Sequence, residues 1–277
     1  DLPKYDSLGT AITYSVSEDH LPNYNEPKLV VKNDVYTITN EYKRTNFTGT
    51  KIWVDGGKTH EQGCYMTDKL TVERTTTPDN EGSWTTVSDA HIHWNAATST
   101  EPYTQSFKIT GLPEKDEDGG KYVYRVVESA IGGDYVTSYS NSDDDATEDF
   151  DESKDDGAIY NSGTVTNKLE KKIPLQGDKT WVEGKDEEHI NTDLGLTLYR
   201  ESTTNGGSVA KTPVEGAVIT GSWDEETGDA TYQFGTYDAE TETFTEGEYD
   251  KYDLEGYEYI YTVGDETGYD AENYTTS

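Results

Sequence analysis

The amino-acid sequence predicts an all-β protein built as a linear array of related β-sandwich modules. Tyrosine is frequent, with 22 residues in a chain of 277, and threonine and valine are common beside it. Aromatic and β-branched side chains favour the half-buried, pleated surface of a sheet. The 26 glycines suit tight turns between strands, and few segments show helical periodicity. Short strand-like blocks also recur in a fixed order, which is typical of a repeat architecture.

The most informative repeat is a short strand with tyrosine and valine at alternating positions. It occurs three times, as ITYSVSED at 12–19, YVYRVVES at 122–129 and YIYTVGDE at 259–266. In each copy a glycine lies seven residues before the central valine. Two further blocks occur twice each: LTVER at 70–74 with LTLYR at 196–200, and YTITN at 36–40 with TVTN at 164–167. The order of these blocks defines one module.

A lysine two residues before a tryptophan opens a module, in KIWVDGG from Lys51 and in KTWVEGK from Lys179. A Thr-Asn pair at the end of a strand closes it. We therefore predict a complete module at 46–170, the C-terminal part of a module at 1–45, and a module that lacks its last strand at 174–277. Unpaired sheet edges are prone to aggregation, so we expect the partial modules to fray or self-associate.

Strand alternation places three polar side chains on the apolar face of the complete module. Successive side chains point to opposite faces of a strand, so Lys51 lies on the same face as Trp53. By the same rule Glu128 shares a face with Val126, and Asn167 lies on the apolar face of the closing strand. Burying any one of these groups alone would be costly. A cation–π pair of Lys51 and Trp53 on an exposed strand is the alternative, but the repetition of ordered blocks favours a buried set.

Buried together, the three groups can react with one another. A desolvated lysine loses its proton more readily and becomes a nucleophile. The side-chain carbonyl of an asparagine is its electrophile. A buried carboxylic acid that stays protonated can polarise this carbonyl and shuttle protons. The predicted product is an amide bond between Lys51 and Asn167, formed with the loss of ammonia.

These blocks resemble the Cna-B domain family of Gram-positive surface proteins. The resemblance is carried by KIWVD, LTVER, LPEKDEDGGKYVYRVVE and TVTN of the complete module, and similar blocks extend it over nearly the whole chain. It implies a transthyretin-like, reversed immunoglobulin β-sandwich in which a first-strand lysine and a last-strand asparagine form an internal isopeptide bond, assisted by the acid of the Tyr-x-Val-x-Glu strand. Carried over to this sequence, the set is Lys51, Glu128 and Asn167.

The two partial modules match part of the same pattern. Glu18 and Asn40 correspond to the acid and the asparagine of the first module. Lys179 corresponds to the lysine of the third module. The acid position there reads Asp265, because strand alternation places Glu266 on the opposite face. An aspartate at this position would depart from the family pattern.

The charge balance excludes several classes of partner. The chain has 56 acidic and 22 basic residues, a net charge of −34. DNA, RNA and anionic lipid surfaces require a basic surface, so we expect none of them as a partner. No apolar run reaches the roughly 18 residues of a membrane-spanning helix. Cys64 is the only cysteine, so no intrachain disulfide can stabilise the modules, and an isopeptide bond would take that role.

We expect a non-enzymatic structural protein: the stalk or fibre of a bacterial cell-surface adhesin, extracellular or anchored to the cell wall, with its own adjacent modules as partners. Its only reaction would be a single-turnover self-crosslinking. One alternative is that the modules bind a host-matrix or neighbouring-cell ligand through the insertions at 75–105, 137–160 and 222–248. A second alternative is that they are auxiliary β-modules of a secreted enzyme.

Other candidate sites are weaker. The acidic segment 142–157 offers the oxygen ligands that calcium prefers, but its spacing does not match an EF-hand loop, so we expect a solvated insertion. His91 and His93 share a strand face that could hold zinc, but no third ligand is evident. Cys64 has no patterned histidine partner. No phosphate-binding or dinucleotide-binding fingerprint occurs, so we predict neither a cofactor nor a metal site.

Overall fold

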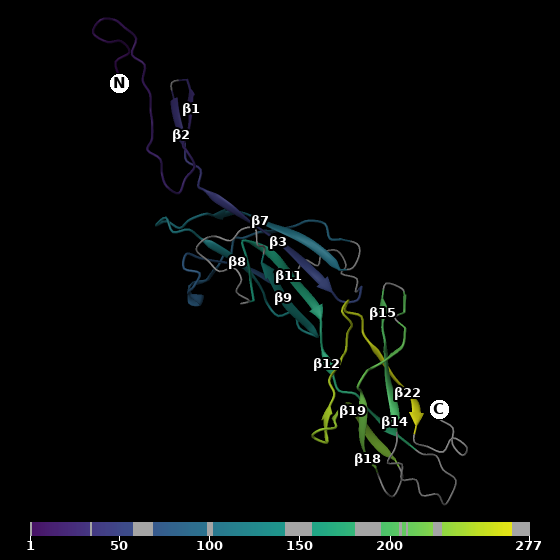
Figure 1. Ribbon diagram of the computed structural model, residues 1–277. Helices are drawn as coiled ribbons and strands as arrows, with labels where there is room; N and C mark the ends of the chain where they lie inside the picture. Colours follow the sequence, from purple (N-terminus) through teal and green to yellow (C-terminus); the bar gives the residue numbers. More distant parts are fainter. Residues whose placement is uncertain are drawn as a thin grey trace, which may run out of the picture.

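The computed structural model describes residues 2–33, 35–57, 69–98, 102–141, 157–180, 195–204, 207–208, 210–223 and 229–267. Within these residues the chain forms β-strands, one short 3-10 helix, η1 (Glu81–Ser83), and no α-helix. The predicted all-β class is therefore confirmed. The strands succeed one another along an elongated chain, from a hairpin of β1 (Lys28–Lys32) and β2 (Val35–Thr39) at one end, through a large middle sheet, to several smaller sheets (Figure 1).

The middle region, residues 46–170, is organised around one nine-stranded sheet. Its order is β5-β4-β8-β10-β11-β3-β7-β6, and β9 pairs with β11. The strands are β3 (Arg44–Val54), β4 (Leu70–Thr75), β5 (Thr85–Thr86), β6 (Ile92–Trp94), β7 (Tyr103–Pro113), β8 (Val123–Glu128), β9 (Tyr135–Asn141), β10 (Ile159–Tyr160) and β11 (Ser162–Leu169). One buried cluster joins side chains from both halves of this order, including Val72, Phe107, Val126 and Val165. The sheet therefore folds over a single core as a β-sandwich.

The first and last long strands of this sandwich are neighbours (Figure 1). β11 pairs with β3 in parallel, which places Asn167 opposite Trp53 and two residues beyond the position opposite Lys51. On β3 every second side chain from Phe47 to Trp53 is buried, so one face of the strand lies in the core. That face carries Lys51.

The C-terminal region, residues 174–267, forms smaller sheets around its own core. Leu198, Tyr232 and Phe234 form its buried centre. β12 (Lys172–Ile173) leads into it and pairs with β21 (Tyr249–Asp250). The other strands are β13 (Gln176–Lys179), β14 (Gly195–Glu201), β15 (Thr203–Thr204), β16 (Gly207–Ser208), β17 (Thr212–Pro213), β18 (Val218–Trp223), β19 (Ala230–Asp238), β20 (Thr243–Glu246) and β22 (Ile260–Thr267).

The junction between the middle and C-terminal regions is held by side-chain hydrogen bonds. The carboxylate of Asp134, just before β9, accepts bonds of 2.8–3.0 Å from the side chains of Lys171, Lys251 and Tyr252. The hydrogen bond from Tyr252 and those from the two lysines hold the pKa of Asp134 well below its ordinary value. The carboxylate is therefore ionised at any physiological pH.

Backbone groups also meet closely at this junction. The Gly56 amide donates a hydrogen bond of 2.9 Å to the carbonyl oxygen of Glu255. A Cβ atom on Gly256, whose φ is +84°, would lie 2.6 Å from the Cα of Asp55. Glycine at this position allows the two regions to approach backbone to backbone.

The junction between the N-terminal and middle regions is built in the same way. Asn23 takes the place of Asp134, because each precedes a tyrosine that pairs two residues beyond the asparagine of a Thr-Asn pair: Tyr24 bridges to Tyr42, and Tyr135 pairs with Leu169. The Asn23 side-chain amide donates to the carbonyl oxygen of Asp116, in a turn of the next region, at 2.9 Å. The backbone contact repeats as well, because Lys43 N donates to Asn23 O just as Glu170 N donates to Asp134 O.

Candidate functional site

The middle region buries a lysine, a glutamate and an asparagine together. Lys51 of β3 and Asn167 of β11 are 0% exposed, and the side chain of Glu128, at the end of β8, is also 0% exposed. Lys51 Nζ lies 3.2 Å from each carboxylate oxygen of Glu128. An ion pair so completely removed from water loses the hydration of both charges. The three residues predicted from the repeat pattern therefore lie in one dehydrated site.

Aromatic rings form part of the wall of this site. The Nζ atom of Lys51 lies 4.7 Å from the centre of the Trp53 ring, in a cation–π contact. Trp53 in turn packs edge-on against Tyr135, with ring centres 5.5 Å apart. The sequence offered burial and a cation–π pair as alternatives for Lys51, and the structure combines them.

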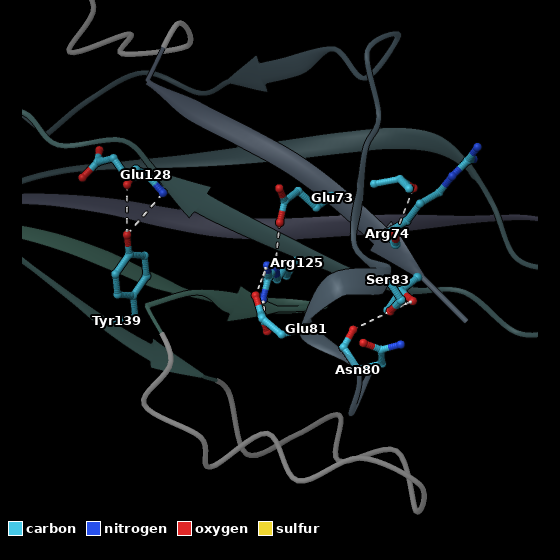
Figure 2. Close-up of polar contacts among 10 residues, drawn as sticks. Glu73, Arg74, Asn80, Glu81, Ser83, Arg125, Glu128 and Tyr139 are labelled. Carbon is cyan, nitrogen blue, oxygen red and sulfur yellow. Dashed lines mark hydrogen bonds and ion pairs between the residues drawn. The ribbon is translucent and has the colours of Figure 1, made fainter. Parts of the chain in front are cut away.

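Tyr139 of β9 fixes the backbone that carries the acid. The Glu128 amide donates to the Tyr139 hydroxyl at 3.2 Å, and this hydroxyl lies 3.4 Å from the Glu128 carbonyl oxygen (Figure 2). Burial raises the pKa of Tyr139, so the phenol keeps its proton and can donate to the carbonyl. The end of β8 is thereby tied to β9, and the Glu128 side chain is left to face Lys51.

A fourth polar side chain, Thr137 of β9, completes the site. Its Oγ1 lies 2.9 Å from Asn167 Oδ1 and 3.3 Å from Glu128 Oε2. Thr137 stands directly opposite Asn167 in the antiparallel pair of β9 and β11. The repeated blocks did not reveal this residue, because β9 belongs to none of them.

A separate polar network on the middle region anchors the segment after β4. Arg125 of β8 donates to Glu73 at 2.8 Å and to Glu81 of η1 at 2.7 Å (Figure 2). Its guanidinium also lies 4.2 Å from the centre of the Trp84 ring. Charge-assisted bonds and ring stacking suit arginine, and here they hold η1 against β8. None of the repeated sequence blocks indicated this network.

In the N-terminal region the structure brings Glu18 and Asn40 together. Asn40 Nδ2 donates to both carboxylate oxygens of Glu18 at 3.1 Å. The pair differs from the middle site in its surroundings, because Glu18 is exposed and Asn40 is half-buried.

In the C-terminal region Lys179 meets Glu266, not Asp265. The Lys179 Nζ lies 2.6 Å from Glu266 Oε1, and the two side chains are only 19% and 11% exposed. Asp265 is exposed and accepts a hydrogen bond from the Tyr199 hydroxyl instead. The prediction that Asp265 faces the lysine is therefore wrong.

The physical reason is a β-bulge in β22. The pairing with β14 shifts between Gly195, opposite Thr267, and Thr197, opposite Gly264, so β22 holds one extra residue there. Asp265 lies within this shift and has a φ of +49°. One extra residue reverses the alternation of side chains beyond it. Glu266 therefore lies on the face toward Lys179, where strict alternation had placed Asp265.

The remaining candidates offer no comparable site. Among the residues that the structure describes, no group of three or more histidine, cysteine, aspartate or glutamate side chains is arranged to hold a metal ion. His91 and His93 lie in this part. Cys64 and nearly all of the acidic segment 142–157 lie outside the described residues. No helix in the described part of the chain is long and apolar enough to cross a membrane.

Comparison with known proteins supports the family suggested by the repeats. The family model described as the Cna protein B-type domain matches residues 1–41 and 47–149. These ranges include Glu18, Asn40, Lys51 and Glu128 and end before Asn167. No curated protein and no solved structure shows a significant match. Domains of this family occur in Gram-positive surface proteins, and because the matched residues make up more than half of the chain, it belongs to the Cna protein B-type domain family.

Proposed function

We propose that this chain is a structural stalk or fibre segment of a bacterial cell-surface adhesin, extracellular and attached to the cell wall, whose modules are stabilised by autocatalytic Lys–Asn isopeptide bonds. The observation that carries the proposal is the fully buried arrangement of Lys51, Glu128 and Asn167. If these residues served only to stabilise the core, apolar side chains of the same volume would give the fold more stability. A buried nucleophile, acid and amide on neighbouring strands are the components of one acyl transfer.

The reaction starts from the ion pair. Transfer of a proton from Lys51 Nζ to Glu128 Oε2 cancels two charges that burial disfavours. The neutral amine then attacks the amide carbon of Asn167, and Oδ1 takes up the proton that Glu128 holds. Glu128 next removes a proton from Nζ and delivers it to Nδ2, which leaves as ammonia when the carbonyl re-forms. The bond from the amide carbon of Asn167 to Lys51 Nζ replaces the bond from that carbon to Nδ2. Glu128 ends protonated and can donate a hydrogen bond to the new amide.

The position of the bond suits a load-bearing stalk. Lys51 and Asn167 lie on the parallel strands β3 and β11, through which the chain enters and leaves the middle module. Tension applied at the two ends of the module would shear these strands past each other. A covalent bond between them would carry that load and leave the roughly 115 residues between them unstretched.

The junctions support the same function. Both use a backbone hydrogen bond to Asn23 or Asp134 and a side-chain contact from that residue to the following module. A contact repeated at successive junctions favours a defined angle between modules over a free hinge. The net charge of −34 would keep such rods soluble and mutually repelling.

Mass spectrometry tests the bond directly. The folded chain should weigh less than its sequence by one ammonia, and digestion should release a peptide containing Lys51 joined to one containing Asn167. Glu128→Gln should keep the fold and restore the full mass. Glu73→Gln is the matched control, because Glu73 lies on the neighbouring strand and binds Arg125, and it should still lose ammonia. An unmodified mass in well-folded parent protein would refute the proposal.

A further inference from the structure

The hydroxyl of Thr137 lies between the acid and the amide of the buried site. Its Oγ1 is 3.3 Å from Glu128 Oε2 and 2.9 Å from Asn167 Oδ1. Oε2 is also the carboxylate oxygen that accepts a hydrogen bond from Lys51 Nζ, at 3.2 Å. A continuous chain of contacts therefore runs from the lysine through the carboxylate and the threonine to the amide oxygen.

The direction of these hydrogen bonds follows from the chemistry of the groups. In the ion-paired site the amide oxygen of Asn167 and the carboxylate of Glu128 both only accept, so the single hydroxyl proton of Thr137 can serve either, and the shorter contact, 2.9 Å, is to Asn167 Oδ1. Once Glu128 has taken the proton of Lys51 in the proposed reaction, its carboxyl group becomes a donor, and the lone pairs of Thr137 Oγ1 can accept from it. The threonine is thus oriented to accept a proton from the acid while giving its own proton to the amide.

We propose that Thr137 is a catalytic residue of the self-crosslinking reaction, relaying the proton between Glu128 and Asn167 and holding the amide in its reactive orientation. This inference rests on the proposed isopeptide function. As the amine attacks, the Glu128 proton passes to Thr137 Oγ1 and the Thr137 proton passes to Asn167 Oδ1. When ammonia leaves, both protons return by the same path. The threonine ends unchanged, and no further reactant is required.

The N-terminal region shows the geometry of a pair without this hydroxyl. Glu26 stands two residues after Tyr24, which forms an isolated bridge with Tyr42, two residues beyond Asn40. Thr137 stands two residues after Tyr135, which pairs with the closing strand in the middle region. Glu26 is therefore the counterpart of Thr137, and its side chain is 84% exposed.

The amide of the N-terminal pair is turned the other way. Asn40 presents Nδ2 to the carboxylate of Glu18, whereas Asn167 presents Oδ1 to Thr137. A carboxylate that accepts from the amide nitrogen draws no electrons from the carbonyl carbon. Activation requires a donor at the oxygen, and in the middle site Thr137 is that donor.

The test uses the full chain and starts from unreacted protein. Chain isolated in denaturant is diluted to refold, samples are quenched in acid, and the loss of ammonia is followed by intact mass. Removal of a general acid–base contribution slows a reaction by roughly 10²- to 10⁴-fold, and we expect Thr137→Val to slow the loss to this extent. Valine keeps the shape of threonine without the hydroxyl. Thr137→Ser, which restores the hydroxyl, should restore the rate.

A background that cannot react separates chemistry from folding. In Lys51→Met chain, Thr137→Val should unfold at a denaturant concentration only modestly below that of Lys51→Met alone, because valine keeps the volume of threonine and only the contacts of its hydroxyl with Asn167 and Glu128 are lost. Ammonia loss from Thr137→Val at the parental rate would overturn the relay while leaving the isopeptide bond in place. Equal slowing in Thr137→Val and Thr137→Ser would also overturn it. Absence of ammonia loss from the parent would refute the proposed function itself.

Discussion

Replacing Asn167 by alanine removes the electrophile of the proposed bond and leaves the Lys51–Glu128 ion pair in place. The bond would close a loop of about 115 residues, which on the chain-entropy model stabilises the folded state by about 4–5 kcal/mol. The substitution also removes the hydrogen bond from Thr137 to Asn167 Oδ1, worth about 1 kcal/mol. We therefore expect the middle module of Asn167→Ala to lose about 5–6 kcal/mol of unfolding free energy.

Hydrogen exchange of the intact chain, read by mass spectrometry, measures this loss in the middle module separately from its neighbours. Amides of β3, β7 and β11 should lose protection together. Thr166→Ala is the matched control, because Thr166 is the adjacent residue of β11 on the opposite face, and a change of only about 0.5–1 kcal/mol is expected there. A loss below about 2 kcal/mol in Asn167→Ala, in a parent that carries the bond, would refute the loop-entropy argument.

Three further predictions concern the junction, the core and the C-terminal region. Asp134→Asn should speed proteolysis between the middle and C-terminal regions. In the parent the same loosening should appear only below about pH 4, because the lowered pKa of Asp134 gives stability that is complete above the unfolded-state pKa and lost as pH falls through the folded one. Gly49→Ala should lower the guanidinium midpoint by a loss of about 1–3 kcal/mol, since its Cβ would lie 2.2 Å from Cζ of Phe107. If the C-terminal region is given a copy of β11, whose asparagine can react with Lys179, the chain should lose a second ammonia. Glu266→Gln should abolish this second loss, whereas Asp265→Asn should leave it unaffected. The reverse result would contradict the bulge assignment.

Strand alternation correctly predicted which side chains form the middle site, because the three strands that carry them are regular. Burial alternates along β3 and β11 through Lys51 and Asn167, and β8 pairs with β4 without a register shift from Val123 to Glu128. The face of each side chain could therefore be read from the sequence alone. The apolar neighbours in each block identified that face as the buried one.

The same rule failed at Asp265 because alternation counts residues and a bulge adds one. A glycine, Gly264, lies at the edge of the bulge, but the repeated block gives no count of the residues opposite it, and the positive φ falls on the next residue, Asp265. Thr137 was missed for a different reason. Its contact with Asn167 depends on the register between β9 and β11, and the 142–161 sequence that connects them carries no short-turn signal from which a register could be predicted. A tight turn would have done so.

Burial couples the proposed reaction to folding in the middle region. The site of Lys51 and Glu128 is closed to solvent. Lys51 and Asn167 become neighbours only when β11 pairs with β3, so they come together when the sandwich closes. The chemical driving force, removal of two charges from an apolar site, arises at the same step. Folding would thus create the reactive site, and the proposed bond would in turn make the strand pairing that created it permanent.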